Sequence, residues 1–315
     1  MTSPKHLLMV GCPRSGTSWL QLLLTQHAKV ATTQETHLFS AYLKHLGQAW
    51  EGHKSLKLRI GMIELLSDDD FYQLCGAFAG AVFQRIADTN PGAEVVLEKT
   101  PDHVRHAPFI LRLLPEAWFL HIIRDPRSVV SSLVAAAQSW GAGWWSSSIV
   151  HNASQWSSDV KLGRQIAALT PRYYEVRYED LVSDAGPKTL EGIFAWLELP
   201  ADLAFCQSTL QACNIDQMQQ DGKDIRDYKT LKSAQPGFIR KGQPNAWKED
   251  LSQTQIAIIE YLVGDLMREC GYLPSTVRIR SAAKLRVATY SALEFVEKRL
   301  RWRMDSAFKK ARSVL

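Results

Sequence analysis

The chain has 315 residues, of which 46% are apolar and 22% are charged, and this composition excludes a disordered, collagen-like or coiled-coil protein. Eleven of its 37 basic and three of its 32 acidic residues lie in residues 276–315, so this tail has a net charge of +8 and residues 1–275 have −3. A slightly acidic body argues against nucleic-acid binding.

The apolar runs and the cysteine count indicate the cellular compartment of the protein. No run approaches the roughly 18 apolar residues of a membrane span, and the apolar stretch at residues 7–10 is too short for a signal-peptide core. The five cysteines are odd in number and form no C-x-x-C pair, so neither a disulfide framework nor a zinc cage is indicated. We therefore expect a protein of the reducing cytoplasm.

Short apolar runs alternate with longer segments of helical spacing along residues 1–275. Strands that alternate with helices form a parallel sheet with helices on both faces, so we expect one α/β domain over residues 1–275. The predicted strands are residues 7–10, 95–98, 118–123 and 173–177, and the predicted helices are residues 18–27, 71–89, 128–137, 154–169, 186–197 and 253–270.

The first predicted strand runs into a turn with two glycines and then into an apolar helix. Gly11 and Gly16 let backbone N–H groups curl around an anion, Thr17 and Ser18 add hydroxyl donors, and the helix N-terminus supplies partial positive charge. The glycine spacing matches that of nucleotide triphosphatases, but Thr17 stands where those enzymes need Lys to reach the β/γ-phosphates. The turn predicts a phosphate site in a fold of the P-loop kind, and a P-loop kinase is the less favoured alternative.

This turn resembles that of the sulfotransferases, which use 3′-phosphoadenosine 5′-phosphosulfate (PAPS) and show a basic residue, Ser/Thr, Gly and two further Ser/Thr residues. The resemblance implies that the loop binds the donor and that Arg14 stabilises the leaving group. The matching residues are Arg14, Ser15, Gly16, Thr17, Ser18 and Trp19.

Three further motifs of that family follow in order. Residues 121–132 resemble the element whose Arg and Ser hold the 3′-phosphate of the nucleotide, here Arg124 and Ser132. Residues 176–181 resemble the K/R-Y-E-D-L signature, whose Tyr lies near the adenine, here Tyr178. Residues 238–248 resemble the segment that wraps the 3′-phosphate, through Arg240, Lys241 and Gly242, although Asn245 replaces its usual second Gly.

The resemblance also implies catalytic groups. Lys99 corresponds to the family Lys that approaches the transferred group, and no metal is required in principle. Cytosolic members place a basic His two residues after that Lys, but this chain has Pro101. Golgi-type members use a Glu after the first helix, which makes Glu35 the first choice for the general base. His37 and His103 are reserve bases, since an imidazole titrates near neutral pH.

The acceptor is not encoded in any motif. A hydroxyl acceptor is expected, with an amine less favoured, and Golgi-type features together with the tryptophans of residues 140–145 and Trp156 give a weak preference for a glycan or glycolipid. A nucleotide-binding adaptor without activity is the third alternative, and the oligomeric state stays open.

Two other segments are predicted to have roles at the surface. The polar stretch 208–245 is too long for a simple connection and predicts a lid or binding loop. Residues 276–315 show the spacing of a basic amphipathic helix, for which docking on the acidic body is slightly favoured over peripheral contact with anionic lipid.

Overall fold

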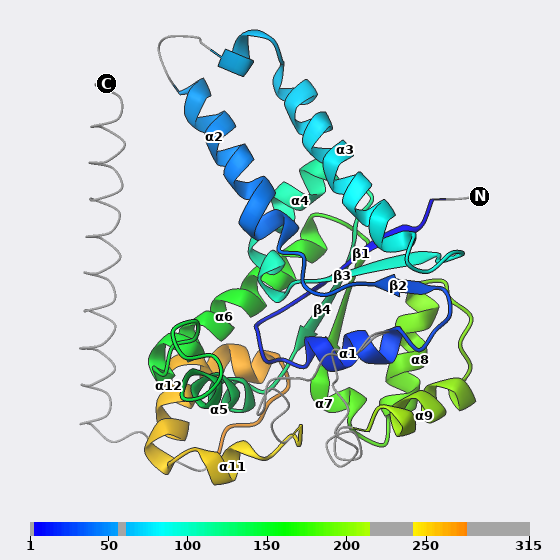
Figure 1. Ribbon diagram of the computed structural model, residues 1–315. Coiled ribbons are helices and arrows are strands. Elements are labelled where there is room, and N and C mark those ends of the chain that lie inside the picture. The colour runs from blue at the N-terminus through cyan, green and yellow to red at the C-terminus, as the bar shows by residue number, and fades with distance from the viewer. Residues whose placement is uncertain (1–2, 56–60, 215–241, 276–315) are drawn as a thin grey trace.

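A five-stranded parallel sheet forms the centre of the molecule in the computed structural model, which describes residues 3–55, 61–214 and 242–275. The spatial order of the strands is β2-β3-β1-β4-β5, so the chain moves to one side of β1 and later to the other (Figure 1). The strands are β1 (Lys5–Val10), β2 (Val30–Thr32), β3 (Val95–Lys99), β4 (Trp118–Ile123) and β5 (Tyr173–Arg177).

Both faces of the sheet are buried, which explains why its strands read as continuous apolar runs. Along β1, Leu7 and Met9 pack into one hydrophobic cluster and Leu8 and Val10 into another, because successive side chains point to opposite faces. The first cluster also contains residues of α1 (Thr17–Leu24), α8 (Gly186–Trp196) and α9 (Leu203–Ala212), and the second contains residues of α3 (Asp68–Ala87) and α4 (Ala107–Leu113). The α/β class predicted from the sequence is confirmed.

Helices of three lengths surround the sheet (Figure 1). The long helices are α3 (Asp68–Ala87), α5 (Pro126–Ala137), α6 (Ile149–Gln165) and α12 (Gln253–Glu269). The intermediate ones are α1 (Thr17–Leu24), α2 (Lys44–Lys54), α8 (Gly186–Trp196) and α9 (Leu203–Ala212). The short ones are α4 (Ala107–Leu113), α7 (Tyr178–Leu181) and α11 (Trp247–Asp250). The remaining helical segments are the π-helical turn η1 (Leu38–Leu43) and the short 3₁₀ helices η2 (Gly61–Glu64), η3 (Pro101–His106) and η4 (Ile166–Ala168).

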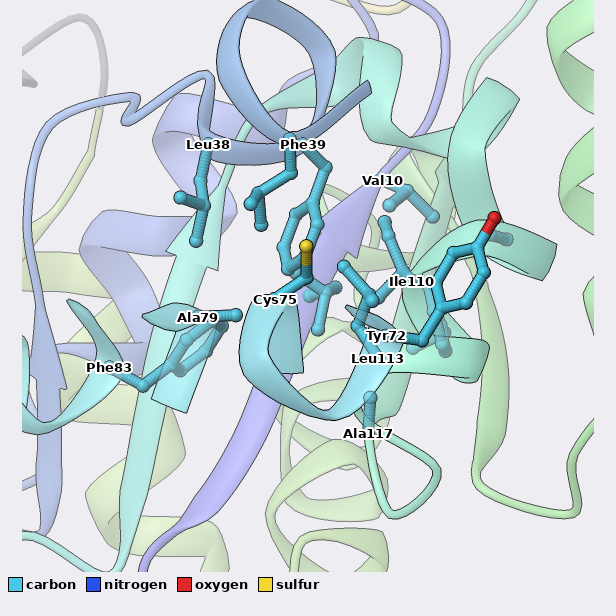
Figure 2. Packing of buried hydrophobic residues seen from close by; sticks show 14 of the residues in the cluster. Val10, Leu38, Phe39, Tyr72, Cys75, Ala79, Phe83, Ile110, Leu113 and Ala117 are labelled. Carbon is cyan, nitrogen blue, oxygen red and sulfur yellow. The ribbon is translucent and has the colours of Figure 1, made fainter. Parts of the chain in front are cut away.

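The helix α3 and the turn η1 close the second cluster over β1 and β3. Phe39, from η1, is fully buried in this cluster and lies near Cys75 of α3 (Figure 2). Leu38 is buried beside it. The segment before η1 is thus anchored by apolar side chains that enter the core.

Several elements differ from the sequence prediction at their ends or were not predicted. The helix predicted from residue 154 begins at Ile149, because the Ser148 hydroxyl accepts a hydrogen bond from the N–H of His151 and caps it. The segment predicted as a loop from residue 208 is still helical up to Ala212. Strand β2 and the helix α4 were missed because they are short, and α2 was missed because it is mostly polar and buries only Gly47 and Trp50.

Candidate functional site

A cavity of about 530 Å³ opens at the carboxyl ends of the strands. It is lined by the turn after β1, by Lys99 at the end of β3, by Arg124 after β4 and by Tyr178 after β5. Because β3 and β4 flank β1 on opposite sides, the cavity lies where the strand order reverses, which is where open α/β sheets bind ligands.

The turn after β1 has the backbone of an anion cradle. Arg14 and Gly16 have left-handed φ angles of 72° and 100°, and α1 begins at the next residue, Thr17. Among the described residues, the Ser15 hydroxyl is fully buried and has no hydrogen-bond partner. An anion at the N-terminus of α1 would give that hydroxyl an acceptor.

Gly16 is required by this geometry, and Gly16→Ala is expected to lower both the melting temperature and the affinity for a phosphate ligand. A Cβ at this position would lie 2.4 Å from the ring of Tyr178, and the left-handed φ adds a penalty of roughly 1–2 kcal/mol. Gly80→Ala in α3 is the control, because a Cβ there meets nothing within 4 Å and helix propensity favours Ala. Equal behaviour of the two variants in thermal unfolding and calorimetry would contradict this prediction.

The residues assigned to the 3′-phosphate come together beside the turn. The Arg14 Nε donates to the Ser132 hydroxyl at 3.0 Å, and Arg124 Nη1 lies 3.5 Å from the Arg14 carbonyl oxygen. The Arg124 guanidinium lies 4.0 Å from the centroid of the Tyr178 ring. Within the described part of the chain, Arg124 Nε is buried without a partner, as expected of a donor that awaits an anion.

Tyr178, which the sequence predicts to lie near the adenine, is almost wholly buried. Its ring packs edge-on against Trp19 with centroids 5.5 Å apart, and its hydroxyl donates to the Gly242 carbonyl oxygen. It therefore ties β5 to the turn after β1 and to the segment that begins at Gly242.

Lys99 and Glu35 form an ion pair at the other end of the cavity. Lys99 Nζ contacts Glu35 Oε1 and donates to the Ser18 hydroxyl at 3.2 Å. The Lys99 side chain is 4% exposed and that of Glu35 is 35% exposed. His37 Nε2 lies 3.5 Å from Glu35 Oε2. Lys99 thus contacts both Glu35, the predicted base, and Ser18 at the start of α1.

The reserve base His103 does not line the cavity. Its side chain is fully buried in η3, with Nδ1 3.0 Å from Glu98 Oε2 and its ring edge-on to Phe39. Burial raises the pKa of the Glu98 carboxyl, but contacts with His103, Thr100 and Thr36 outweigh this and hold the pKa below its usual value. An acceptor cannot reach a group buried in this way.

The tryptophans divide between the cavity and the core. Trp140, Trp144 and Trp145 line the cavity, and the Arg14 guanidinium lies 5.6 Å from the Trp140 ring centroid. Trp156 is fully buried and donates to the Arg124 carbonyl oxygen at 2.9 Å. Three indoles therefore belong to the cavity, whereas Trp156 supports Arg124 from behind.

Sequence reasoning missed several residues of the cavity wall. Arg105 lines it while making two hydrogen bonds, of 2.8 and 2.9 Å, to the buried carboxylate of Asp159. Asp102 and Gln155 line it as well. Gln155 and Asp159 are four residues apart and therefore lie on one face of α6. This spacing was the only sequence pattern that could have linked these two residues to one site.

The wall favours an anionic ligand. Among its described residues the cationic side chains are Arg14, Lys99, Arg105 and Arg124, and the carboxylates are Glu35 and Asp102. Arg240 and Lys241, predicted to wrap the 3′-phosphate, lie outside the described residues, as do most of segment 208–245 and the tail 276–315. In the described ranges no helix is long and apolar enough to cross a membrane.

Comparisons with known proteins bear on the family and the fold of this chain. The sequence profile of the "Sulfotransferase family" matches residues 6–202. The nodulation protein NoeE of Sinorhizobium fredii is 23% identical over 89% of this chain and 68% of its own length. Protein-tyrosine sulfotransferase 2 of Gallus gallus is 28% identical over 39% of this chain, and the match spans only 32% of that protein.

Among solved structures, mouse sulfotransferase SULT7A1 complexed with PAP superposes with a TM-score of 0.54 at 13% identity, over 85% of this chain and 86% of that one. At this identity the likeness concerns the fold, which both chains build around a similar sheet. Since the profile covers well over half of the chain, including the turn after β1 and the residues after β3, β4 and β5, this protein belongs to the sulfotransferase family.

Proposed function

We propose that the protein transfers a sulfuryl group from PAPS to a hydroxyl group of an acceptor. Sulfotransfer is the activity of its family, and the donor and acceptor are the proposed parts. The observation that carries the proposal is the Lys99–Glu35 ion pair, which faces the phosphate loop in one cavity. A cation and a carboxylate beside the turn after β1 support a role in sulfuryl transfer.

The donor fits the polar groups that the cavity offers. The buried Ser15 hydroxyl, the N-terminus of α1 and Thr17 would hold its 5′-phosphosulfate end. Arg124 and Ser132 would hold the 3′-phosphate, for which a planar guanidinium is well shaped. The mouse neighbour was solved with PAP, which supports a nucleotide of this kind.

Transfer requires three tasks of these residues. The acceptor oxygen forms a bond to sulfur while the bond from sulfur to the 5′-phosphate oxygen breaks, and Glu35 takes the acceptor proton. Arg14 and the N–H groups at the start of α1 stabilise the charge that develops on the leaving phosphate. Lys99 offsets the negative charge of the sulfuryl oxygens and keeps Glu35 beside them.

The acceptor enters past Trp140, Trp144 and Trp145. Indole faces stack on sugar rings and on aromatic rings, so glycans and phenols are the acceptor classes that this wall favours. The tyrosine acceptor in the name of the chicken relative belongs to the second class. Asp102 and Gln155 on the same wall offer hydrogen bonds to acceptor hydroxyls.

The test compares two donors on the full-length protein. With radiolabelled PAPS and a panel of an oligosaccharide, a tyrosine peptide and a simple phenol, we expect label on at least one acceptor. With γ-labelled ATP and the same panel, we expect none, because Thr17 replaces the lysine of nucleotide triphosphatases. Transfer from ATP and not from PAPS would overturn the proposal in favour of a kinase, and tighter binding of ADP than of adenosine 3′,5′-bisphosphate would overturn the donor.

A further inference from the structure

The side chains at the end of β3 have different surroundings on the two sides of the strand. Lys99 reaches the cavity, whereas its neighbours Glu98 and Thr100 point to the opposite side, toward η1 and η3, as alternation along a strand requires. Neither Glu98 nor Thr100 lines the cavity. Their contacts nevertheless lead to the segment that carries Glu35.

One carboxylate oxygen of Glu98 accepts three hydrogen bonds. Its carboxylate is fully buried, and Oε1 accepts from the Thr36 N–H at 3.1 Å, from the Thr36 hydroxyl at 2.8 Å and from the Thr100 hydroxyl at 2.6 Å. Its other oxygen lies 3.0 Å from His103 Nδ1. Burying a carboxylate costs free energy unless it is paired and hydrogen-bonded, so these contacts hold the Glu98 side chain in one position.

The same network continues along the segment after Glu35. The His37 N–H donates to the Thr100 hydroxyl at 3.3 Å, and the Leu38 N–H donates to the Thr36 hydroxyl at 3.1 Å. The three successive backbone N–H groups of residues 36 to 38 thereby donate to the side chains of Glu98, Thr100 and Thr36, respectively.

The segment is also held before and after these bonds. On the upstream side, the Gln21 amide of α1 donates to the Thr32 hydroxyl at 2.7 Å and to the Thr33 carbonyl oxygen at 2.9 Å. On the downstream side, Leu38 and Phe39 enter the core. Glu35 lies between these anchors, next to the residue that Glu98 binds.

We infer that Glu98, through Thr36, is a positioning residue that holds Glu35 against Lys99 for proton transfer. Glu98 and Thr100 flank Lys99 on β3, and they bind the residues that follow Glu35, so a single network sets the distance between the two groups. The inference rests on the proposed role of Glu35 as base. His103, buried against Glu98, takes part in this support and not in catalysis.

Thr36 is the probe of choice, because removing Glu98 would leave buried donors unpaired in the core. Thr36→Val keeps the shape of the side chain and removes the hydroxyl, whereas Thr36→Ser keeps the hydroxyl. A small misplacement of a catalytic group can cost about a hundredfold, so we expect Thr36→Val to lower kcat by about tenfold to a hundredfold. We expect the KM for PAPS to stay unchanged and Thr36→Ser to restore most of the rate.

A double-mutant cycle separates positioning from a general structural effect. If Thr36 acts through Glu35, Thr36→Val should cost little further rate in a Glu35→Gln background, since the group it positions is gone. Thr189→Val in α8 is the control, because that hydroxyl donates to the carbonyl oxygen of Ala185, the N-cap of the same helix. Calorimetry with adenosine 3′,5′-bisphosphate should give the same affinity for all of these variants.

These measurements distinguish failure of the positioning role from failure of Glu35 as the proposed base. If Glu35→Gln loses turnover while Thr36→Val retains it, the positioning role is overturned and the proposed base stands. Additive losses in the cycle, or equal loss in Thr36→Ser and Thr36→Val, also overturn the positioning role. If Glu35→Gln retains full turnover, the proposed base falls and the positioning role falls with it.

Discussion

Glu35→Gln is expected to lower kcat by about a hundredfold to ten-thousandfold, which is the usual contribution of a general base. The amide keeps the size of the side chain but cannot take the acceptor proton. We propose this role for Glu35 because its carboxylate lies in the cavity, in contact with Lys99 and 3.5 Å from His37. Initial rates with saturating PAPS and acceptor measure the effect.

The matched control is Glu94→Gln, which removes an exposed carboxylate paired with Lys29 outside the cavity. It should leave the rate intact. The affinity of Glu35→Gln for adenosine 3′,5′-bisphosphate should match that of the unaltered protein, because Glu35 is proposed to touch the acceptor and not the nucleotide. Full turnover in Glu35→Gln together with a large loss in His37→Ala would move the base to the histidine.

Arg124→Ala is expected to weaken binding of adenosine 3′,5′-bisphosphate by roughly tenfold to a hundredfold, since a charge-assisted hydrogen bond contributes about 1.5–3 kcal/mol. The same change should barely affect adenosine 5′-monophosphate, which lacks the 3′-phosphate. The reason is local: Arg124 Nε is buried without a partner among the described residues, and the guanidinium is held over Tyr178. Calorimetry with the two nucleotides measures the difference.

Arg268→Ala is the control for loss of positive charge. Its guanidinium is about half exposed on α12 and pairs with Asp265, and it does not line the cavity. It should leave the binding of both nucleotides unchanged. If Arg124→Ala weakened the monophosphate as much as the bisphosphate, the assignment of Arg124 to the 3′-phosphate would be wrong.

The sequence was most informative where local pattern and tertiary burial coincide. The four predicted strands correspond to β1, β3, β4 and β5, because short runs rich in apolar and aromatic residues are typical of strands in a parallel sheet. Strand β2, with only three residues, carries too little pattern to be recognised. The helix α9 was taken partly as loop for a related reason, since its segment is polar on its exposed side.

Contacts between distant residues could not be predicted from spacing. The sequence alone determined the α/β class, the phosphate turn after β1 and the order of the family motifs, because these depend on short segments with strong local constraints. Only the tertiary structure decided that Glu35 and Lys99 touch across 64 positions of sequence, and that Glu98 binds the residues beside Glu35. It also decided that His103 and Trp156 are buried while three other tryptophans line the cavity. The physical reason is that parallel strands bring their carboxyl ends to one edge of the sheet, so residues far apart in the chain meet there. Whether a given side chain faces the cavity or the core is set by packing, which local sequence patterns do not determine.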